Sequence, residues 1–226
     1  MNAIEHNLKQ IQQRIHDAAI AIGRNPQNIN LLAVSKTRTV EELRQALDAG
    51  QIHFGENYLD EALLKIQKIA GRAIWHFIGP IQSNKTRPIA EHFDWVHSID
   101  RLKIATRLSE QRPDSLAPLK ICLQVNTSSE STKSGVSPDA LLTLAKEVNT
   151  LPNLELRGLM TIPAAENQIE KQKIPFRLLM QLQQQLKSNG IVLDTLSMGM
   201  SNDYEVAITQ GATMVRIGTA LFGPRA

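Results

Sequence analysis

The chain has 226 residues, of which 42% are hydrophobic and 21% are charged, and its formal net charge at pH 7 is +3. This composition is that of an ordinary globular protein, and the apolar runs are far too short to cross a bilayer, so no membrane-spanning protein is expected. Acidic and basic residues alternate without a Lys or Arg run, and only 4% of the residues are aromatic, so no nucleic-acid partner is expected.

The first predicted element is an amphipathic helix at the N-terminus. In "MNAIEHNLKQIQQRIHDAAIAIG", the residues Ile4, Leu8, Ile11 and Ile15 recur at helical spacing with polar residues between them. The segment lacks the short apolar block of a secretory signal, so a cytoplasmic location is expected. The single Cys122, inside the apolar run "ICLQV", fits a reducing compartment and is expected in the core.

Eight short apolar runs follow, separated by amphipathic helical patterns such as "TVEELRQALDAG" and "SPDALLTLAKEVNT". This alternation favours an α/β fold, a single (β/α)8 TIM-type barrel with an extra N-terminal helix, formed by residues 1–226 as one domain. A doubly wound sheet is the alternative. The predicted strands lie at 30–36, 52–55, 73–79, 94–99, 120–126, 154–162, 193–199 and 213–223. The polar loops 126–139 and 163–175 follow strands, and in a barrel such loops form the C-terminal face, where active sites are built.

Lys36 ends the first predicted strand in "LLAVSKTRT", residues 31–39. In a barrel it would lie at the C-terminal mouth. Desolvation by the apolar strand would lower its pKa and leave a neutral amine able to attack a carbonyl and form a Schiff base. The alternative is a structural lysine whose stem packs on the strand while its ammonium group reaches water.

The loops after the last two strands predict an anion site. In "SMGMSNDYEVAITQG" a helix is expected to begin near Ser201 or Asn202, and in "MVRIGTALFG" the eighth strand ends at Gly218 and Thr219. Backbone N–H groups, a hydroxyl and a residue without a side chain suit a phosphate, and these two loops are the usual phosphate site of such barrels. Each loop alone also reads as an ordinary turn or cap. Beside Lys36 they suggest a ligand with both a phosphate and an aldehyde, pyridoxal 5'-phosphate.

Arg216 lies two residues before Gly218, so on a strand both residues face the same side. An inward Arg at this position could donate to the pyridine nitrogen of the cofactor and would keep that nitrogen unprotonated, which makes the ring a weaker electron sink. The alternative is an Arg that pairs with an acidic residue inside the barrel.

The remaining polar residues on strands give weaker predictions. Asn57 follows the second strand in "FGENY", and His76 lies within the third in "WHFIGPIQSNK". Either could line the cavity, but a turn asparagine and a core histidine explain them equally well. No His pair has metal-ligand spacing, so no metal site is predicted, and the absence of a P-loop, G-x-G-x-x-G or G-x-S-x-G motif disfavours nucleotide-binding and hydrolase functions.

Taken together, eight motifs resemble the YggS/PROSC family of pyridoxal phosphate homeostasis proteins. They are "AVSKT", "FGENY", "WHFIGPIQSNK", "VHSIDR", "KSG", "RGLMTIP", "LSMGMSNDYEVAI" and "VRIGTALFG", and they span nearly the whole chain in order. The resemblance implies a barrel related to the N-terminal domain of alanine racemases, fold type III of the vitamin B6-dependent proteins, which binds pyridoxal phosphate as an aldimine.

The resemblance also implies a set of site residues. Lys36 matches the Schiff-base lysine, and Arg216 would face the pyridine nitrogen. Lys133 in "TKSG" occupies the loop where racemases place a basic residue near the phenolic oxygen, although a solvated loop lysine is an equal alternative. The other implied positions are the phosphate-binding Ser201, Asn202, Gly218 and Thr219, with Asn57 and His76 near the ring.

The chain departs from the racemases because it ends at "FGPRA", without the C-terminal β-domain that supplies their tyrosine as second acid/base. Racemisation requires proton transfer on both faces of the carbanion, and Tyr58 and Tyr204 do not match that role. The expected function is therefore a non-catalytic carrier or regulator of pyridoxal phosphate that acts in homeostasis of the cofactor, is a monomer and passes the cofactor to apo-enzymes. The alternatives are a small amino-acid racemase and a protein–protein module that signals cofactor status.

Overall fold

Eight parallel strands close into a barrel in the computed structural model, which describes residues 2–69, 71–128 and 134–224. Each strand pairs with the next along the chain, and β8 closes the barrel against β1 with Asn30 opposite Met214 and Ala33 opposite Ile217. The predicted barrel is therefore confirmed over the doubly wound sheet. The strands are β1 (Asn30–Val34), β2 (His53–Glu56), β3 (Ile74–Phe77), β4 (Trp95–Ile99), β5 (Leu119–Gln124), β6 (Leu154–Met160), β7 (Thr195–Met200) and β8 (Met214–Ile217).

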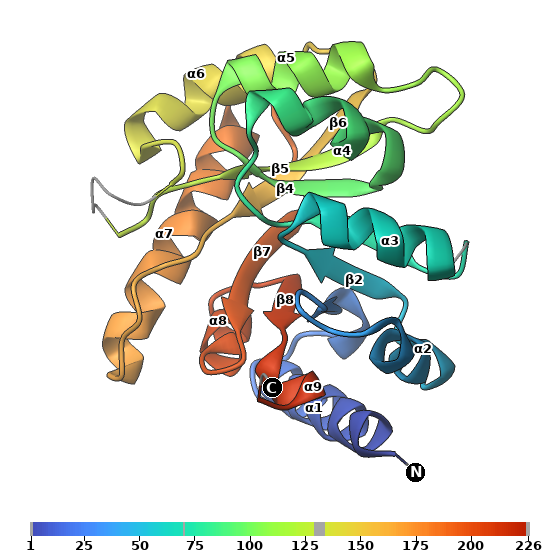
Figure 1. The fold of residues 1–226 in the computed structure, drawn as a ribbon. Helices are drawn as coiled ribbons and strands as arrows, with labels where there is room; N and C mark the ends of the chain where they lie inside the picture. The colour runs from blue at the N-terminus through green and yellow to red at the C-terminus, as the bar shows by residue number, and fades with distance from the viewer. Residues whose placement is uncertain (1, 70, 129–133, 225–226) are drawn as a thin grey trace.

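Helices surround the barrel, and the predicted extra N-terminal helix is α1 (Ala3–Ile20). It packs against the last helix, α9 (Thr219–Phe222), so the first and last helices of the described chain lie side by side (Figure 1). The other helices are α2 (Val40–Asp48), α3 (Leu59–Ile69), α4 (Thr86–His92), α5 (Leu102–Gln111), α6 (Pro138–Val148), α7 (Ile169–Ser188) and α8 (Tyr204–Thr209), with short 3-10 turns at Pro26–Asn28 and Ser83–Lys85. None of the described helices combines the length and apolar character needed to span a membrane.

Local sequence signals fix where several helices begin. Thr39 and Glu42 form a capping box at the start of α2, in which each side chain accepts from the backbone N–H of the other residue. Ser137 caps α6, and Pro138 occupies its first turn, where the missing N–H has no cost. These caps fix the residues at which the strand-to-helix loops before α2 and α6 end.

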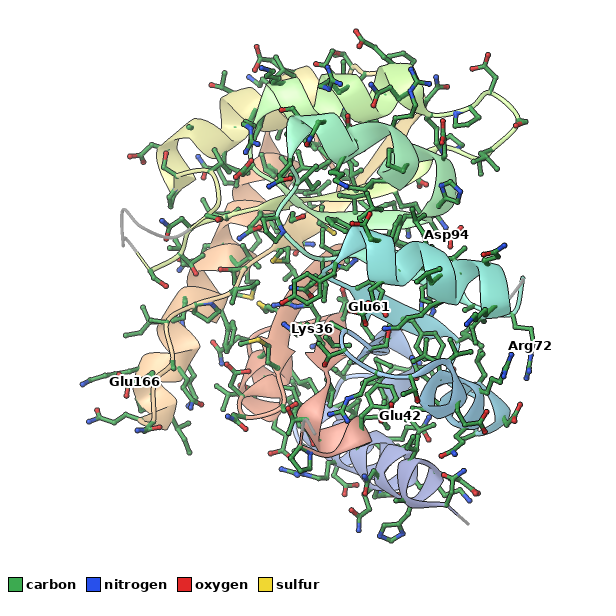
Figure 2. All side chains as sticks on the ribbon, in the orientation of Figure 1. Lys36, Glu42, Glu61, Arg72, Asp94 and Glu166 are labelled. Atoms are coloured by element: carbon green, nitrogen blue, oxygen red, sulfur yellow. The ribbon has the colours of Figure 1, made fainter. Side chains whose placement is uncertain are left out.

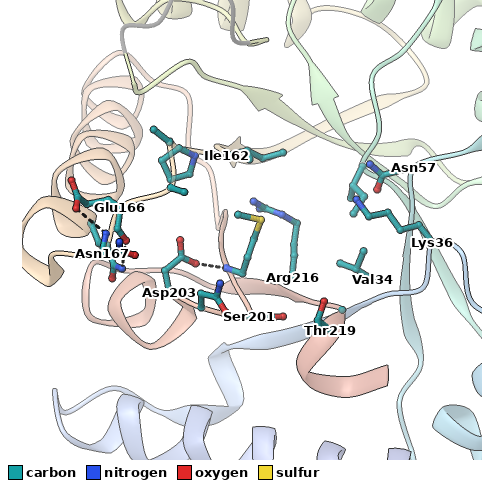
Figure 3. A pocket seen from close by; sticks show the side chains of 18 of the residues that line it. Val34, Lys36, Asn57, Ile162, Glu166, Asn167, Ser201, Asp203, Arg216 and Thr219 are labelled. Atoms are coloured by element: carbon teal, nitrogen blue, oxygen red, sulfur yellow. Dashed lines mark hydrogen bonds between the residues drawn. The ribbon is translucent and has the colours of Figure 1, made fainter. Parts of the chain in front are cut away.

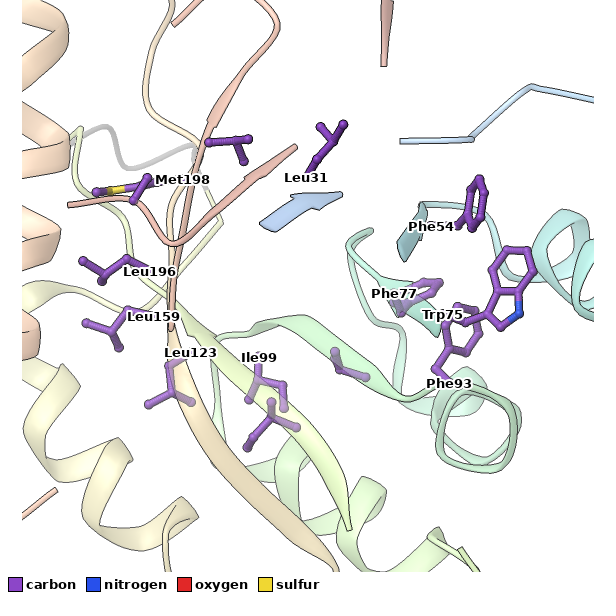
Figure 4. Close-up of a cluster of buried hydrophobic side chains, with 14 of the residues drawn as sticks. Leu31, Phe54, Trp75, Phe77, Phe93, Ile99, Leu123, Leu159, Leu196 and Met198 are labelled. Carbon is purple, nitrogen blue, oxygen red and sulfur yellow. The ribbon is translucent and has the colours of Figure 1, made fainter. Parts of the chain in front are cut away.

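The main hydrophobic core lies between the sheet and the helices. Alternate residues of the strands face outward into this layer, as Phe54 of β2, Phe77 of β3 and Leu123 of β5 show in Figure 4. The inside of the barrel holds different side chains. They include two small apolar clusters, one of Leu32, Ile78 and Met214 and one of Trp95, Cys122 and Met160. Cys122 is fully buried, as predicted, and burial raises the pKa of its thiol.

The chain after the last two strands differs from the prediction. The expected strand over 213–223 is wrong beyond Ile217, because Gly218 turns the chain and α9 follows. Leu221 and Phe222 are buried on this helix, which packs on α1, so their apolar character reflects a helix–helix contact rather than a strand. The helix after β7 begins at Tyr204 instead of Ser201 or Asn202.

Candidate functional site

A pocket of about 580 Å³ opens at the C-terminal end of the barrel. Residues at the ends of β1, β7 and β8 form its floor and one wall, and the loop that leads into α7 forms the opposite wall (Figure 3). The position agrees with the general rule that barrel sites are built from the loops at this face. The lining residues are Val34, Lys36, Arg38, Asn57, Ile78, Ile162, Pro163, Ala164, Ala165, Glu166, Asn167, Gln172, Met200, Ser201, Asn202, Asp203, Arg216, Gly218 and Thr219.

Most of the residues predicted for a site meet in this pocket. Those that line it are Lys36, Asn57, Ser201, Asn202, Arg216, Gly218 and Thr219. Figure 3 shows Lys36 and Asn57 on one side, Arg216 in the middle, and Ser201 and Thr219 along the floor. Residues from segments up to 183 positions apart in the sequence are thus brought together by closure of the barrel between β8 and β1.

Two residues predicted for the site are not among the described residues that line this pocket. His76 is fully buried in the barrel interior, where its ring stacks on Trp95 with centroids 5.4 Å apart. It also hydrogen-bonds to His53 and His97. Lys133 lies outside the described residues.

The backbone on both sides of Lys36 is anchored by a buried ionic cluster of Ser35, Glu56, Glu61 and Lys65. The Ser35 hydroxyl donates to Glu56 Oε1 at 2.6 Å, and Lys65 Nζ donates to the Ser35 carbonyl at 2.6 Å. On the other side, the Thr37 N–H donates to Glu61 Oε1 at 2.6 Å. Figure 2 shows Glu61 beside Lys36 near the centre of the molecule. These bonds fix the direction in which the Lys36 side chain leaves the strand.

Thr37 needs such an anchor because its φ of +64° lies in the left-handed region, which a β-branched residue rarely adopts. A conformation of this kind costs on the order of 1–3 kcal/mol and persists only where the surroundings impose it. Here the bond from Thr37 N–H to Glu61 and the bonds of Lys65 to Glu56 and Glu61 supply that support. The strained turn directly after Lys36 is therefore part of what aims its amine into the pocket.

Within the cluster, Lys65 and Glu56 form an ion pair away from solvent. Lys65 Nζ lies 2.8 Å from Glu56 Oε1, and the two side chains are 4% and 0% exposed. Burial raises the pKa of the Glu56 carboxyl, while the charge of Lys65 and the hydrogen bonds from Lys65 and Ser35 oppose that rise. The pair keeps Glu56 able to accept both hydrogen bonds that hold Ser35 and Lys65 in place.

Arg216 is buried beneath the pocket and donates to two neutral oxygens. Its Nη1 lies 2.8 Å from Ser197 Oγ, and its Nη2 lies 2.7 Å from the Thr161 carbonyl. No ion pair of Arg216 is found among the described residues, so the predicted alternative, an acidic partner in the barrel, is not observed there. Burial lowers the pKa of the guanidinium to about 10, so the group remains charged at neutral pH.

The loops after β7 and β8 are held by close packing. Gly199 has a φ of +92°, and a Cβ there would lie 2.6 Å from the Ala207 Cβ, so the turn out of β7 requires glycine. Asp203 Oδ1 then accepts the Met200 N–H at 2.6 Å, and Ser201 Oγ accepts the Ala220 N–H at 3.4 Å. The second bond ties the two loops to each other across the pocket floor.

The sequence did not indicate every residue of the pocket. Arg38 donates to the Phe222 carbonyl at 3.3 Å and the Pro224 carbonyl at 3.2 Å, and so holds the C-terminal segment at the pocket rim. Residues 162–167 form the far wall, although only the position of their loop was predicted. Apolar lining residues such as Val34 and Ile78 cannot be assigned to a pocket from the sequence, because buried strand residues of this type are equally common in ordinary cores.

Two further observations bear on what could bind here. The Asn57 side-chain oxygen is buried without a hydrogen-bond partner among the described residues, and a donor on a bound molecule would satisfy it. The lining has three cationic side chains, Lys36, Arg38 and Arg216, against the carboxylates of Glu166 and Asp203. The part of the chain that the structure describes contains no group of three or more His, Cys, Asp or Glu residues able to hold a metal ion.

Comparison with known proteins extends these observations to the whole chain. The family model described as alanine racemase, N-terminal domain, matches residues 1–226. A Pseudomonas aeruginosa protein named pyridoxal phosphate homeostasis protein is 57% identical over 226 residues, 100% of this chain and 97% of the relative. A protein of the same name from Escherichia coli K12 is 51% identical over 229 residues, 100% of this chain and 98% of the relative.

A solved structure is also similar. PipY of Synechococcus elongatus, with PLP bound, superposes with a TM-score of 0.82 at 33% identity, over 97% of this chain and 100% of PipY. The matches therefore include every strand and loop that lines the pocket.

Proposed function

The chain belongs to the alanine racemase N-terminal domain family and, within it, to the pyridoxal phosphate homeostasis proteins, and from this premise we propose that it binds pyridoxal 5'-phosphate. Its role would be intracellular homeostasis of that cofactor, with little or no turnover. One observation supports this most directly. The amine of Lys36, the guanidinium of Arg216 and the hydroxyls of Ser201 and Thr219 line one pocket of about 580 Å³.

Each of these residues has a defined task in the proposal. Lys36 Nζ forms a covalent bond with the aldehyde carbon, and one water leaves. Ser201, Asn202, Gly218 and Thr219 hold the phosphate, and Arg216 donates to the pyridine nitrogen. When bound, the cofactor supplies an electron-withdrawing ring. Arg216 would reduce the ability of this ring to withdraw electrons, because a guanidinium that stays protonated gives no proton to the pyridine nitrogen. Asn57 lies near the ring, and Lys133 remains a proposed contact of the phenolic oxygen.

Low turnover is proposed because no tyrosine, the residue that serves as second acid/base in the racemases, is among the described residues that line the pocket. Neither tyrosine of the chain lines the pocket: Tyr204 is buried between α8 and α1, and Tyr58 is 56% exposed before α3. A racemase needs a proton donor on each face of the substrate, and one lysine serves only one. Polarimetry with L-alanine and fully loaded protein tests this point, since a steady loss of optical rotation would favour the racemase alternative.

Direct transfer of the cofactor is the central test of the carrier role. Loaded protein is mixed with a pyridoxal phosphate-dependent apo-enzyme in the presence of a hydrazine that traps free aldehyde. Recovery of the apo-enzyme's activity at a rate unaffected by the trap is expected for handover between proteins. Complete suppression of recovery by the trap would show release to solvent and would contradict direct carriage. The same mixtures, run on a sizing column, report whether the chain is a monomer, as proposed.

The phosphate contact predicts a selective effect of Thr219. Thr219→Val removes the hydroxyl but keeps the shape of the side chain, and a hydrogen bond to a charged group contributes about 1.5–3 kcal/mol, so the affinity for pyridoxal phosphate should fall roughly 10- to 150-fold. Binding of pyridoxal, which has no phosphate, should change little. Equilibrium dialysis of both ligands measures the difference. The control is Thr209→Val, an exposed threonine on α8. Equal weakening for both ligands would place the phosphate elsewhere.

A further inference from the structure

An unbroken line of hydrogen-bonded side chains runs through the barrel interior. His53 Nδ1 lies 2.9 Å from His76 Nε2, and His76 Nδ1 lies 2.9 Å from His97 Nε2. His97 Nδ1 then lies 2.9 Å from Ser197 Oγ, which also accepts from Arg216 Nη1 at 2.8 Å. These residues come from β2, β3, β4, β7 and β8, so the line crosses from one side of the barrel to the other.

The two ends of this line open to different places. Arg216 lines the pocket at the C-terminal ends of the strands. His53 lines a second pocket of about 470 Å³, whose other lining residues include Asn30, Thr195 and Met214, each at the start of its strand. The line therefore joins the two ends of the barrel. His76 and His97 between them are fully buried.

The surroundings favour the neutral form of all three imidazoles. Burial lowers the pKa of His53, His76 and His97, and for His97 the value is about 3. The surrounding charges add to this effect: Lys120 on β5 acts against protonation of His53 and His76, and Arg216 acts against protonation of His97.

Carboxylates also face the open end of the line. Asp94, before β4, favours the charged form of His53. The second pocket also presents Asp194, paired with Arg157, and Arg24, which donates to the Ile208 and Ala212 carbonyls. His53 is the half-buried ring of the three and is the one where a proton from solvent would enter first.

Neutral imidazoles impose a single direction on the line. Each ring has one N–H donor and one acceptor nitrogen, so the two His–His bonds can be satisfied only if all three rings carry the proton on the same kind of nitrogen. With Nε2–H on each ring, Ser197 accepts from Arg216 and donates its own proton to His97 Nδ1. With Nδ1–H on each ring, Ser197 would accept twice, and the hydrogen bonds of the described residues give its proton no acceptor. The first arrangement gives every proton inside the line an acceptor, and only the Nε2–H of the half-buried His53 has none among the described residues.

We propose that His53, His76 and His97 are positioning residues for Arg216, locked as Nε2–H tautomers, and that they transmit the proton state of the second pocket to the cofactor pocket. A doubly protonated His53 carries a proton on Nδ1 and donates it to His76 Nε2. His76 then carries its own proton on Nδ1 and donates it to His97 Nε2. His97 in turn donates from Nδ1 to Ser197 Oγ. The line gains one proton in this change: His76 and His97 each keep one proton, now on Nδ1, so every bond of the line reverses, and the Ser197 hydroxyl proton turns away from His97. The effect on a bound cofactor rests on the function proposed above, whereas the line itself does not.

The test reads the tautomers directly, with no cofactor present. Long-range ¹H–¹⁵N correlation spectra of the full chain, labelled with ¹⁵N, show which nitrogen of each imidazole carries the proton. At neutral pH the three interior rings should all be Nε2–H. On acidification, a single midpoint should appear at all three rings, with His53 becoming doubly protonated while His76 and His97 change to Nδ1–H. Mixed tautomers at neutral pH, or a His53 titration that His97 does not follow, would overturn the proposal.

A break in the middle of the line separates transmission from local effects. His76→Phe keeps an aromatic ring to stack on Trp95 but removes both nitrogens, so His53 should still titrate while the His97 signals no longer respond. The matched control is His92→Gln, because His92 is exposed on α4 and bonds only to the Pro88 carbonyl among the described residues. A His97 response that survives His76→Phe would show that the coupling does not pass through these rings.

A second measurement addresses the cofactor. With pyridoxal phosphate bound, the visible absorption maximum should shift with the His53 midpoint in the wild-type protein and lose that shift in His76→Phe. Coupled imidazole signals without an absorption shift would support the coupling of the three histidines but contradict their effect on the cofactor. If the protein binds no pyridoxal phosphate at all, the proposed function fails. The imidazole spectra still decide whether the three histidines are coupled.

Discussion

Lys36→Ala is expected to abolish covalent capture of pyridoxal phosphate completely. The amine of Lys36 is the nucleophile that the end of β1 delivers into the pocket, and no other lysine is among the residues that line it in the described part of the chain. Without this amine the aldehyde has no partner there. The visible absorption band of the bound cofactor should be lost, and mass spectrometry after borohydride reduction should detect no adduct.

Two further variants make this result specific. Lys36→Arg keeps the charge but cannot form the bond, so it should also give no adduct, which excludes a purely electrostatic role. Lys171→Ala removes an exposed lysine at the start of α7, near the same mouth, and should leave the adduct unchanged. An adduct of unchanged yield in Lys36→Ala would refute the assignment of this lysine, whatever the affinity for the cofactor.

Lys65→Met is expected to cause the largest loss of stability among single substitutions near the site. It leaves the Glu56 carboxylate, which is 0% exposed, without the cation that lies 2.8 Å away. Breaking a buried pair by removing one partner costs about 3–5 kcal/mol of the free energy of unfolding. Urea denaturation followed by circular dichroism measures the loss. Lys103→Met, on the exposed face of α5, is the control and should change stability little.

The loss should depend on pH in a defined direction. Without Lys65, desolvation raises the folded-state pKa of Glu56 further above the ordinary value of 4.5. The protonated carboxyl is tolerated in the folded state, so the destabilisation is small at and below pH 4.5, grows as the pH rises from there toward the folded-state pKa, and levels off above it. The double variant Lys65→Met, Glu56→Gln lacks the Glu56 carboxyl and should recover most of the stability and lose the pH dependence that Glu56 causes. A pH-independent loss in Lys65→Met would show that packing, not charge, explains its cost.

The same cluster links stability to the site. Lys65 and Glu61 hold the carbonyl of Ser35 and the N–H of Thr37, the two residues that flank Lys36. The double variant therefore separates the role of the cluster in stability from its role in positioning Lys36, since it can fold well and still leave the Thr37 turn with weaker support. Slower covalent capture of the cofactor in a stable double variant is the expected sign of a positioning role for this cluster.

Local patterns were sufficient to predict the barrel and several of the residues that line its pocket. Apolar runs alternating with capped amphipathic helices indicated eight strand–helix units, because hydrophobic periodicity and helix caps are properties of short segments. The same patterns placed Lys36, Ser201 and Gly218 at the ends of strands, and the barrel rule then placed those ends at one face. Prediction failed at 213–223, where apolar residues serve a helix that packs on α1, a contact with a segment some 200 residues earlier.

The sequence by itself determined which chemical groups this protein can present and at which strand ends they stand. Only the tertiary structure decided how the intervening polar residues are used. His76 was predicted near a ligand, but closure of the barrel aligns it with His53, His97 and Ser197, which share no sequence spacing. The sequence likewise did not predict the ionic cluster of Glu56, Glu61 and Lys65. A buried ion pair forms only where two segments pack together and exclude water, and this packing cannot be inferred from either segment alone. Contacts inside a closed sheet depend on strand register and stagger, and no local pattern of residues encodes these.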